Sequence, residues 1–312
     1  MNASKAKGDQ VMSDVILRIN DLSKKYGSKT ALDHVSFSVE KGKIYGFIGE
    51  NGAGKTTAIR AITGLSAAPD GSIELFGHTG RKGLEEGRKK LGCLVERPIL
   101  ALNKTAYDNL AMQQILYGNS DGNKALQLLE RVGLSDVKDK KVKDFSLGMK
   151  QRLGIALTLI NDPELLILDE PVNGLDPVGM FEVRELLKSL CENEKITIVI
   201  SSHILAELYQ LVTDYIIISH GKIIETLSKD ELNDKCTSYI VFETDRNDEA
   251  MNVLLQNGVE KAEQDGNAIK VYDGLQTRTI AEWMKKSNIL VTLLMRNEIS
   301  LEKYYMDLLG RT

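Results

Sequence analysis

The stretch Gly49-Glu50-Asn51-Gly52-Ala53-Gly54-Lys55-Thr56 matches the pattern G-x-x-x-x-G-K-S/T, and it lies between an apolar run at 44–48 and a segment of helical character at 54–65. Glycines allow backbone N–H groups to turn toward an anion, and a following helix directs its positive N-terminus at the same anion. In such a loop the lysine reaches the β- and γ-phosphates of a nucleotide, and the hydroxyl residue faces Mg²⁺. A chance match in a flexible loop is the alternative, which the flanking strand and helix disfavour. The residues expected to hold ATP here are Gly49, Asn51, Gly52, Ala53, Gly54, Lys55, Thr56 and Thr57.

A second motif is an apolar run at 165–168 that ends in Asp169 and Glu170. Four apolar residues predict a buried strand, and its carboxyl end is where open α/β sheets place their ligands. We expect Asp169 to hold Mg²⁺, and Glu170 to accept a hydrogen bond from the attacking water and polarise it. Alone, such a pair is equally consistent with a solvated strand end. Together with the loop at 49–56 it predicts a P-loop NTPase in which Lys55 also serves catalysis.

The segments around these motifs alternate between short apolar strands and helices. Strands that are apolar throughout predict an α/β fold with a largely parallel sheet covered on both faces. Patterns of helical period dominate from about 88 to 161, which predicts a helical insertion in the α/β core. Strands are expected at 15–19, 35–39, 44–48, 72–76, 165–168, 196–200 and 215–219, and helices at 54–65, 107–117, 124–132, 178–192 and after His203.

The last part of the chain, 226–312, has a different order of segments. A strand, a helix, two strands around the hairpin dipeptide Asp265-Gly266, a helix and a strand follow one another, and a helix at 301–309 ends the series. The order β-α-β-β-α-β is typical of a small ferredoxin-like α+β sandwich. We therefore expect a flexible extension at 1–13, an ATPase domain at 14–225 and an accessory domain at 226–312.

The composition excludes several classes of protein. Apolar residues make up 42% and charged residues 27%, which is typical of a globular protein with a proper core. The net charge of −4 argues against a strongly basic nucleic-acid-binding protein. Cys93, Cys191 and Cys236 lie far apart, which predicts reduced thiols rather than a zinc site or disulfides. The N-terminal stretch lacks the apolar region of a signal peptide, and no run approaches the roughly 18 to 20 apolar residues that span a bilayer.

A third motif, Phe145-Ser146-Leu147-Gly148-Met149-Lys150-Gln151-Arg152, precedes a helix and resembles the signature of ATP-binding cassette (ABC) proteins, whose common form is Leu-Ser-Gly-Gly-Gln. Leu147 and Met149 depart from that form, whereas Ser146 and Gly148 keep it. A hydroxyl, an uncovered backbone N–H and a helix N-terminus can contact a γ-phosphate. The resemblance covers about residues 14–225 and implies a RecA-like ABC ATPase core with a helical subdomain.

The resemblance implies roles for three further residues. Tyr26 lies where the family stacks an aromatic ring on adenine, although a lone tyrosine is more often part of a core. Asp176, in the stretch 171–177, resembles the aspartate of the D-loop at the dimer interface. His203 matches the switch histidine that senses the γ-phosphate, although a lone histidine at a strand end is usually structural.

One position departs from the family pattern. Where most members have a glutamine that reaches Mg²⁺ and couples the site to the membrane subunit, this chain has Glu96, in the stretch 94–98. Glutamate keeps a metal-seeking oxygen and adds a negative charge. The change resembles the E-loop of lantibiotic-immunity and bacitracin-exporter ATPases, and the ending at 299–305 is similar to the tail of the bacitracin type. A tolerated polar exchange is the alternative.

The resemblance also implies partners. Ser146 and Gly148 lie too far along the helical insertion to close the site of their own chain, and the family solves this with a head-to-tail dimer that holds two ATP molecules between two copies. It further implies an ABC-2-type membrane permease, no nucleic acid, and a peripheral place on the cytoplasmic face of the cell membrane. We expect an ATPase that exports antimicrobial peptides. The alternatives are another cargo, such as a drug or lipid, and an ABC ATPase outside transport.

Overall fold

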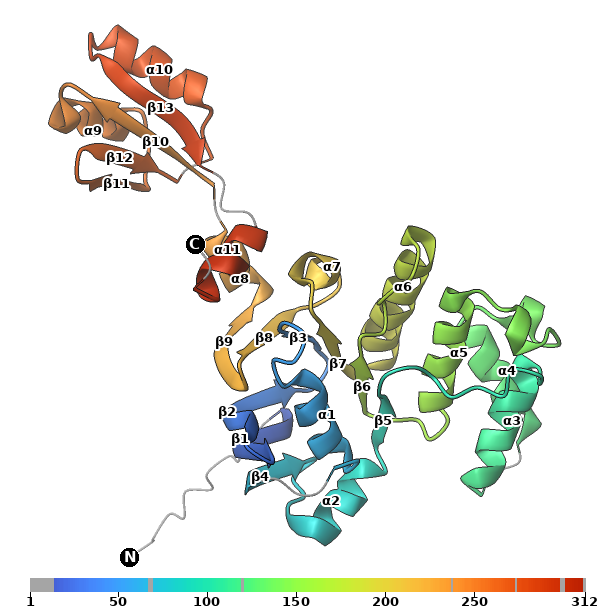
Figure 1. Cartoon of the computed structure of the whole chain (residues 1–312). Helices are drawn as coiled ribbons and strands as arrows, with labels where there is room; N and C mark the ends of the chain where they lie inside the picture. The colour runs from blue at the N-terminus through green and yellow to red at the C-terminus, as the bar shows by residue number, and fades with distance from the viewer. Residues whose placement is uncertain are drawn as a thin grey trace, which may run out of the picture. The chain divides into compact units, whose positions relative to one another are not determined.

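The computed structural model describes residues 14–66, 70–118, 121–236, 238–272, 274–297 and 301–310 (Figure 1). The chain divides into two compact units, residues 1–228 and 229–312, and each has its own fold. The extension expected at 1–13 and the first two residues of the tail at 299–305 lie outside the described residues.

A six-stranded sheet forms the centre of the first unit. In order across the sheet, its strands are β5 (Leu91–Leu94), β6 (Leu165–Asp169), β7 (Thr197–Ser202), β3 (Ile44–Ile48), β8 (Asp214–Ser219) and β9 (Lys222–Ser228). The first five run parallel, and β9 pairs with β8 antiparallel. Strands β3, β6 and β7 are buried along their whole length, because both faces of the sheet are covered. The predicted parallel sheet is therefore confirmed.

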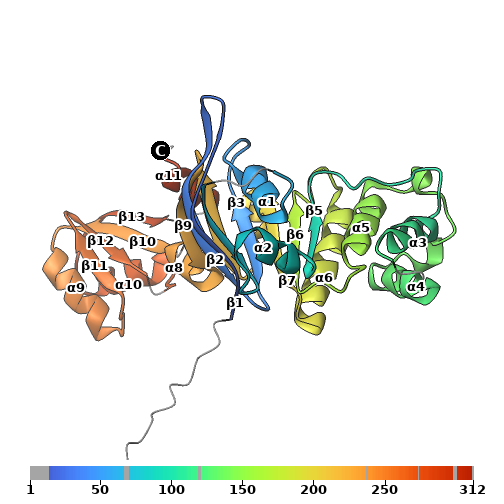
Figure 2. The ribbon, with the colours of Figure 1, turned by 90° about the horizontal axis from the view of Figure 1, so that it is seen from below.

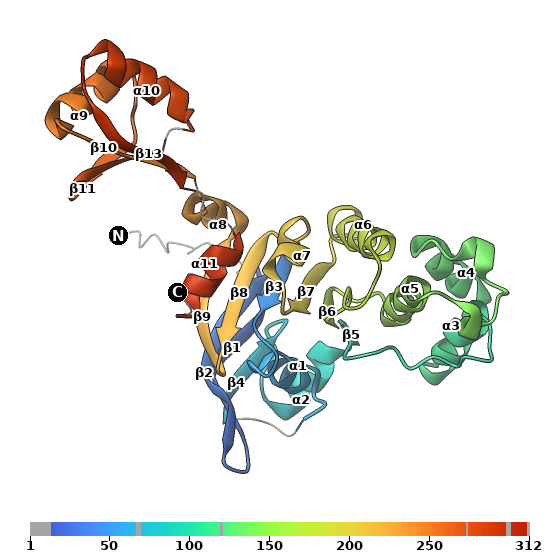
Figure 3. The same ribbon diagram turned by 45° about the horizontal axis from the view of Figure 1, so that its top comes forward.

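A second, antiparallel sheet lies against the first and consists of β2 (Lys29–Glu40), β1 (Val15–Tyr26) and β4 (Asp70–Leu75). Helix α1 (Lys55–Thr63) packs between the two sheets, and one hydrophobic cluster joins Ile59 of this helix with Phe47 and Leu17. Helices α6 (Pro177–Glu194) and α7 (Leu205–Tyr209) cover the other face of the central sheet (Figure 3). The strands predicted at 15–19 and 35–39 are parts of longer strands of 12 residues each.

The segment expected to be helical from about 88 to 161 begins with a strand. Strand β5 forms the edge of the parallel sheet beside β6, and α2 (Gly80–Arg88) precedes it. The four residues of β5 are too few to show a periodic pattern in the sequence. A Cβ at Gly92 would lie 2.6 Å from the Thr158 carbonyl oxygen, so close packing requires glycine at this position. The insertion after β5 is helical as predicted, with α3 (Ala106–Leu116), α4 (Gly122–Arg131) and α5 (Leu147–Thr158).

The second unit contains a four-stranded antiparallel sheet with two helices on one face (Figure 2). Phe242, Leu254 and Met284 are fully buried in its core. The sheet order β11-β12-β10-β13 is that of a ferredoxin-like sandwich, which confirms the predicted order of elements. The elements are α8 (Lys229–Lys235), β10 (Tyr239–Thr244), α9 (Asn247–Gln256), β11 (Ala262–Asp265), β12 (Ala268–Val271), α10 (Thr277–Lys286), β13 (Val291–Asn297) and α11 (Leu301–Leu308).

The sequence patterns did not predict β9 and α8, which follow directly after β8. The first five residues of strand β9 alternate between exposed and half-buried, so its sequence lacks the continuous apolar run of its neighbours. Among the described residues, every helix is too short or too polar to cross a membrane.

Candidate nucleotide-binding site

The glycine-rich loop connects β3 to α1 at the carboxyl end of the parallel sheet. At Gly54 the backbone φ is +116°, and a Cβ there would lie 2.7 Å from the Ala31 carbonyl oxygen. At Gly49 a Cβ would lie 2.4 Å from the carbonyl oxygen of Ile218 on β8. Both positions therefore exclude any larger residue. Among the described residues, no side chain caps the N-terminus of α1, which leaves its first amides for an anion.

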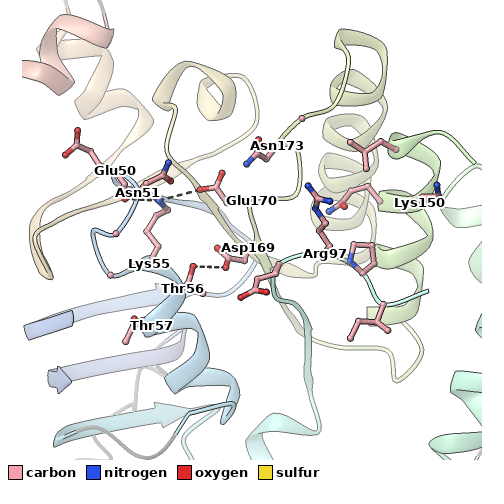
Figure 4. Close-up of a pocket in the computed structure, with 18 of the residues that line it drawn as sticks. Glu50, Asn51, Lys55, Thr56, Thr57, Arg97, Lys150, Asp169, Glu170 and Asn173 are labelled. Carbon is pink, nitrogen blue, oxygen red and sulfur yellow. Dashed lines mark hydrogen bonds and ion pairs between the residues drawn. The ribbon is translucent and has the colours of Figure 1, made fainter. Parts of the chain in front are cut away.

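Lys55 is the first residue of α1, and its side chain is 6% exposed. Its Nζ donates hydrogen bonds to the carbonyl oxygens of Gly49 (2.6 Å) and Glu50 (3.2 Å). The same Nζ lies 3.5 Å from Oε1 of Glu170 (Figure 4). A buried ammonium group is costly unless it is paired and hydrogen-bonded, so these three oxygens stabilise the lysine inside the loop.

The two acidic residues predicted at the end of β6 lie beside the loop. Asp169 is buried, and its Oδ2 accepts a hydrogen bond of 2.9 Å from the hydroxyl of Thr56 (Figure 4). Glu170 is the next residue and has a positive φ of +52°. Its Oε2 lies 2.8 Å from Nδ1 of His203, which follows β7. Lys55, Thr56, Asp169, Glu170 and His203 thus form one connected polar cluster.

A cavity of about 1030 Å³ opens over this cluster. Its walls come from the loop, the end of β1 and the start of α5, so both the α/β core and the helical insertion contribute. The predicted residues that line it are Tyr26, Asn51, Gly52, Gly54, Lys55, Thr56, Thr57, Glu96, Asp169 and Glu170. Further lining residues that the sequence patterns did not single out are Lys29, Arg97, Pro98, Lys150, Gln151 and Asn173.

Six predicted residues do not line this cavity of their own chain: Gly49, Ala53, His203, Ser146, Gly148 and Asp176. The last three lie at the starts of α5 and α6. Ser146 is the N-cap of α5, and its Oγ accepts a hydrogen bond of 3.2 Å from the Met149 amide. Asp176 is the N-cap of α6, and its Oδ1 accepts one of 2.8 Å from the Gly179 amide. A Cβ at Gly148 would lie 3.3 Å from the Cα of Gly179, so α5 and α6 approach closely at this position. Each of the three residues thus has a local structural role within its own chain.

Glu96 lines the cavity and forms an ion pair with Arg60 of α1. Its backbone φ is +64°, which is uncommon for a residue other than glycine, and its side chain is 63% exposed. The negative charge that distinguishes this position is therefore compensated by a cation on the helix that follows the loop.

Ser201 on β7 is a residue that the sequence patterns missed. It is fully buried, donates a hydrogen bond to Oδ1 of Asp169 and accepts one of 2.9 Å from the Glu170 amide. A signal existed in the polar pair Ser201-Ser202 at the end of a β-branched strand, immediately before His203.

The donor set suits Mg²⁺ bound together with a nucleotide. Mg²⁺ prefers oxygen ligands, keeps several waters and is usually held by one or two protein groups plus phosphate oxygens. The adjacent oxygens of Thr56 and Asp169 supply such a pair. Within the described ranges there is no cluster of three His, Cys, Asp or Glu residues that could hold a metal without a nucleotide.

Comparison with known proteins adds an independent finding. The family described as "ABC transporter" matches residues 32–173. The bacitracin transport ATP-binding protein BcrA of Bacillus licheniformis is 42% identical over 95% of this chain and 97% of its own length. The lantibiotic transport ATP-binding protein SrtF of Streptococcus pyogenes is 45% identical over 74% of this chain and 100% of its own. A crystal structure of an ATP-binding cassette of an ABC transporter, MJ1267 in its ADP conformation, covers 70% of this chain and 92% of its own with a TM-score of 0.64 and 26% identity.

Proposed function

The chain belongs to the ABC transporter family as an ATP-binding subunit, and on that premise we propose that it hydrolyses ATP to export antimicrobial peptides through a membrane permease. ABC ATP-binding subunits are ATPases coupled to transport, and this chain has their core fold. The proposal concerns the cargo, the direction of transport, the permease and the role of each residue in the site.

One observation carries the proposed chemistry: Lys55, Thr56, Asp169 and Glu170 converge on a single cavity at the carboxyl end of the sheet (Figure 4). Lys55 is held by two loop carbonyls and by Glu170. A triphosphate offers the same ammonium group stronger, charged acceptors. We infer that the Lys55 ammonium group binds the phosphates when a nucleotide is present, and that its ion pair with Glu170 is then broken.

Glu170 is the proposed general base. Once it is free of Lys55, its carboxylate can accept a hydrogen bond from a water molecule and polarise it toward the γ-phosphate. His203 holds the other oxygen at 2.8 Å and so fixes the direction in which the carboxylate points. Thr56 and Asp169 would hold Mg²⁺, which when bound neutralises the charge of the phosphates.

A second copy of the chain is proposed to complete the site. Ser146 and Gly148 do not line the cavity of their own chain, and we infer that they contact the γ-phosphate of a nucleotide bound to another copy. In a head-to-tail dimer the N-terminus of α5 would face the nucleotide bound to the partner, with Asp176 at the interface. Hydrolysis then removes the γ-phosphate that joins the two copies, and the interface loosens.

The proposed cargo rests on the relatives. BcrA matches this chain from the ATPase unit to the C-terminal unit, and its name states bacitracin transport. SrtF matches 74% of this chain, and its name states lantibiotic transport. We infer an ABC-2-type permease as the membrane partner, with this chain peripheral on the cytoplasmic face.

The test has a biochemical and a cellular part. Purified protein is expected to bind Mg-ATP and to release phosphate, whereas Lys55→Ala is expected to weaken ATP binding at least about 10-fold, because it removes a charge-assisted contact. Protein isolated from membranes is expected to carry a permease subunit with it. A strain that lacks the gene should be more sensitive to bacitracin or to a lantibiotic, and wild type but not Lys55→Ala should restore resistance. Unchanged sensitivity of the null strain to both would remove the antimicrobial-peptide proposal.

A further inference from the structure

We propose that Ser201 is a positioning residue for ATP hydrolysis, whose hydroxyl orients both Asp169 and Glu170 from the neighbouring strand. The inference rests on the proposed function, because it assigns a role within the same reaction. Ser201 would not touch the nucleotide, since it is fully buried and does not line the cavity.

The register of the central sheet brings Ser201 to the acidic pair. Strands β6 and β7 run parallel, and Asp169 is the direct partner of Ser201 between them. The Ser201 Oγ is hydrogen-bonded to Oδ1 of Asp169 and lies 2.9 Å from the backbone nitrogen of Glu170. The Ser201 hydroxyl therefore contacts both Asp169, the proposed metal ligand, and Glu170, the proposed general base.

The direction of these hydrogen bonds follows from the number of protons available. A serine hydroxyl has one proton to donate, and it can also accept. The backbone N–H of Glu170 can only donate, so the Ser201 oxygen accepts from it. The single hydroxyl proton is thereby left for Asp169, whose carboxylate is the acceptor. The network has one arrangement rather than several.

For Asp169 the consequence is a fixed carboxylate plane. Ser201 holds Oδ1 and Thr56 holds Oδ2 at 2.9 Å, so the group is tethered on both oxygens. Partners that hydrogen-bond a ligating carboxylate orient it, and their loss commonly lowers metal affinity or activity 10- to 100-fold. Ser201 would thus set the angle at which Asp169 meets Mg²⁺.

For Glu170 the consequence is a stabilised backbone conformation. Its φ of +52° lies in the left-handed region, which is unfavourable for a residue with a side chain. The hydrogen bond from its amide to Ser201 holds the peptide in that conformation. From there the Glu170 carboxylate reaches Lys55 at 3.5 Å and His203 at 2.8 Å. Without the hydroxyl, the part-buried amide loses this acceptor, and the orientation of the Glu170 carboxylate is less well fixed.

The adjacent Ser202 provides a matched control. It is equally buried on β7, but its hydroxyl accepts a hydrogen bond of 3.0 Å from the Ile204 amide and lies 3.2 Å from Glu207. Ser202→Ala therefore removes a buried hydroxyl from the same strand without touching Asp169 or Glu170.

The experiment compares full-length wild type with Ser201→Ala, Ser201→Thr and Ser202→Ala. The measurements are kcat for ATP hydrolysis, the affinity for a fluorescent ATP analogue in EDTA, and the Mg²⁺ concentration that gives half of the metal-dependent increase in analogue binding. For Ser201→Ala we expect kcat to fall at least about 10-fold and the required Mg²⁺ to rise by a similar factor. Metal-free binding should stay within about 2-fold, because the phosphate loop is unchanged and the protein is folded. Ser201→Thr keeps the hydroxyl and is expected to stay closer to wild type.

Two results would overturn the inference. The first is that wild type hydrolyses ATP and Ser201→Ala has the same kcat and requires the same Mg²⁺ concentration. The other is an equal loss in Ser201→Ala, Ser201→Thr and Ser202→Ala with metal-free binding intact, because that would assign the effect to packing of β7 rather than to the Ser201 hydroxyl. A wild type that fails to hydrolyse ATP would instead overturn the proposed function, so the two failures are distinguishable.

Discussion

In this structure His203 is hydrogen-bonded to Glu170, with Nδ1 of the imidazole 2.8 Å from Oε2 of the carboxylate. The other carboxylate oxygen lies 3.5 Å from Nζ of Lys55. The glutamate that is proposed to activate water is thus held between a lysine expected to move to phosphate and a histidine expected to sense it.

Glu170→Gln should keep ATP binding and lose hydrolysis. The amide preserves the shape of the side chain but cannot serve as a base, so kcat should fall at least about 100-fold. ATP that is bound and not hydrolysed should hold two copies together, which light scattering in Mg-ATP would detect as a dimer. Glu192→Gln, at an exposed position of α6, is the matched control. Normal turnover by Glu170→Gln would contradict the assignment.

Arg60 and Glu96 should be energetically coupled. Their ion pair compensates a charge that glutamine at this position would not carry. Glu96→Gln is expected to retain nucleotide binding and hydrolysis and to change the rate of hydrolysis. Arg60→Met should weaken ATP binding less in the Glu96→Gln background than in wild type, because the unpaired carboxylate repels phosphate. For an exposed pair the coupling should be about 0.2–1 kcal/mol, measured by a double-mutant cycle. Additive effects on binding would remove the idea of compensation.

Gly148→Ala should destabilise the protein although alanine favours helices. The new Cβ would lie 3.3 Å from the Cα of Gly179, so α5 and α6 must separate slightly. Overpacking costs about 1–3 kcal/mol, and the gain in helix propensity is at most about 1 kcal/mol, so a net loss is expected. The control is Gly83→Ala on α2, whose Cβ would have only an ordinary contact at 3.4 Å and which should be neutral or stabilising. Thermal unfolding of the two variants decides between these expectations.

The contribution of Glu164 to the free energy of unfolding should depend on pH. Nζ of Lys90 lies 2.8 Å from its carboxylate, and this hydrogen bond, with a weaker one from Lys41, holds the pKa of Glu164 below its usual value. A lowered folded-state pKa means that stabilisation is present above the unfolded pKa of about 4.3 and is lost as the pH falls through the folded value. Because the side chain is 38% exposed, Glu164→Gln should cost only about 0.5 kcal/mol at pH 7. Urea unfolding should show that Glu164→Gln is less stable than wild type at pH 7 and equally stable below the pKa of Glu164 in the folded protein. A loss of stability that persists in acid would assign the effect to packing instead.

Residues 229–312 should fold by themselves. They contain a separate core in which Phe242 and Met284 are fully buried, and the single tryptophan of the chain, Trp283, packs against it. The isolated segment should unfold cooperatively, as followed by Trp283 fluorescence. Phe242→Ala should lower its stability by about 3–5 kcal/mol, most of what a small domain has. If the isolated segment is unfolded, its own core is insufficient to stabilise it without the rest of the chain.

The features that the sequence predicted are those encoded by neighbouring residues. The glycine-rich loop before Lys55, the strand at 44–48 and the acidic pair at the end of β6 all follow from short patterns of apolar, glycine and charged residues. The hairpin between β11 and β12 was predictable for the same reason, because turn residues determine the local backbone. The predicted dipeptide Asp265-Gly266 was wrong by one residue, since Asp265 pairs with Ala268 and the turn residues are Gly266 and Asn267. Roles such as adenine stacking by Tyr26 or a dimer contact by Asp176 remain predictions.

The tertiary structure alone decided which distant residues meet. Ser201 contacts Asp169, and Arg60 pairs with Glu96, across 32 and 36 residues of chain. Such contacts depend on sheet register and on the packing of α1 against the segment after β5, which no local spacing encodes. The short edge strand β5 was missed for the same physical reason, since its pairing with β6 and its close approach at Gly92 stabilise it more than any pattern of its own.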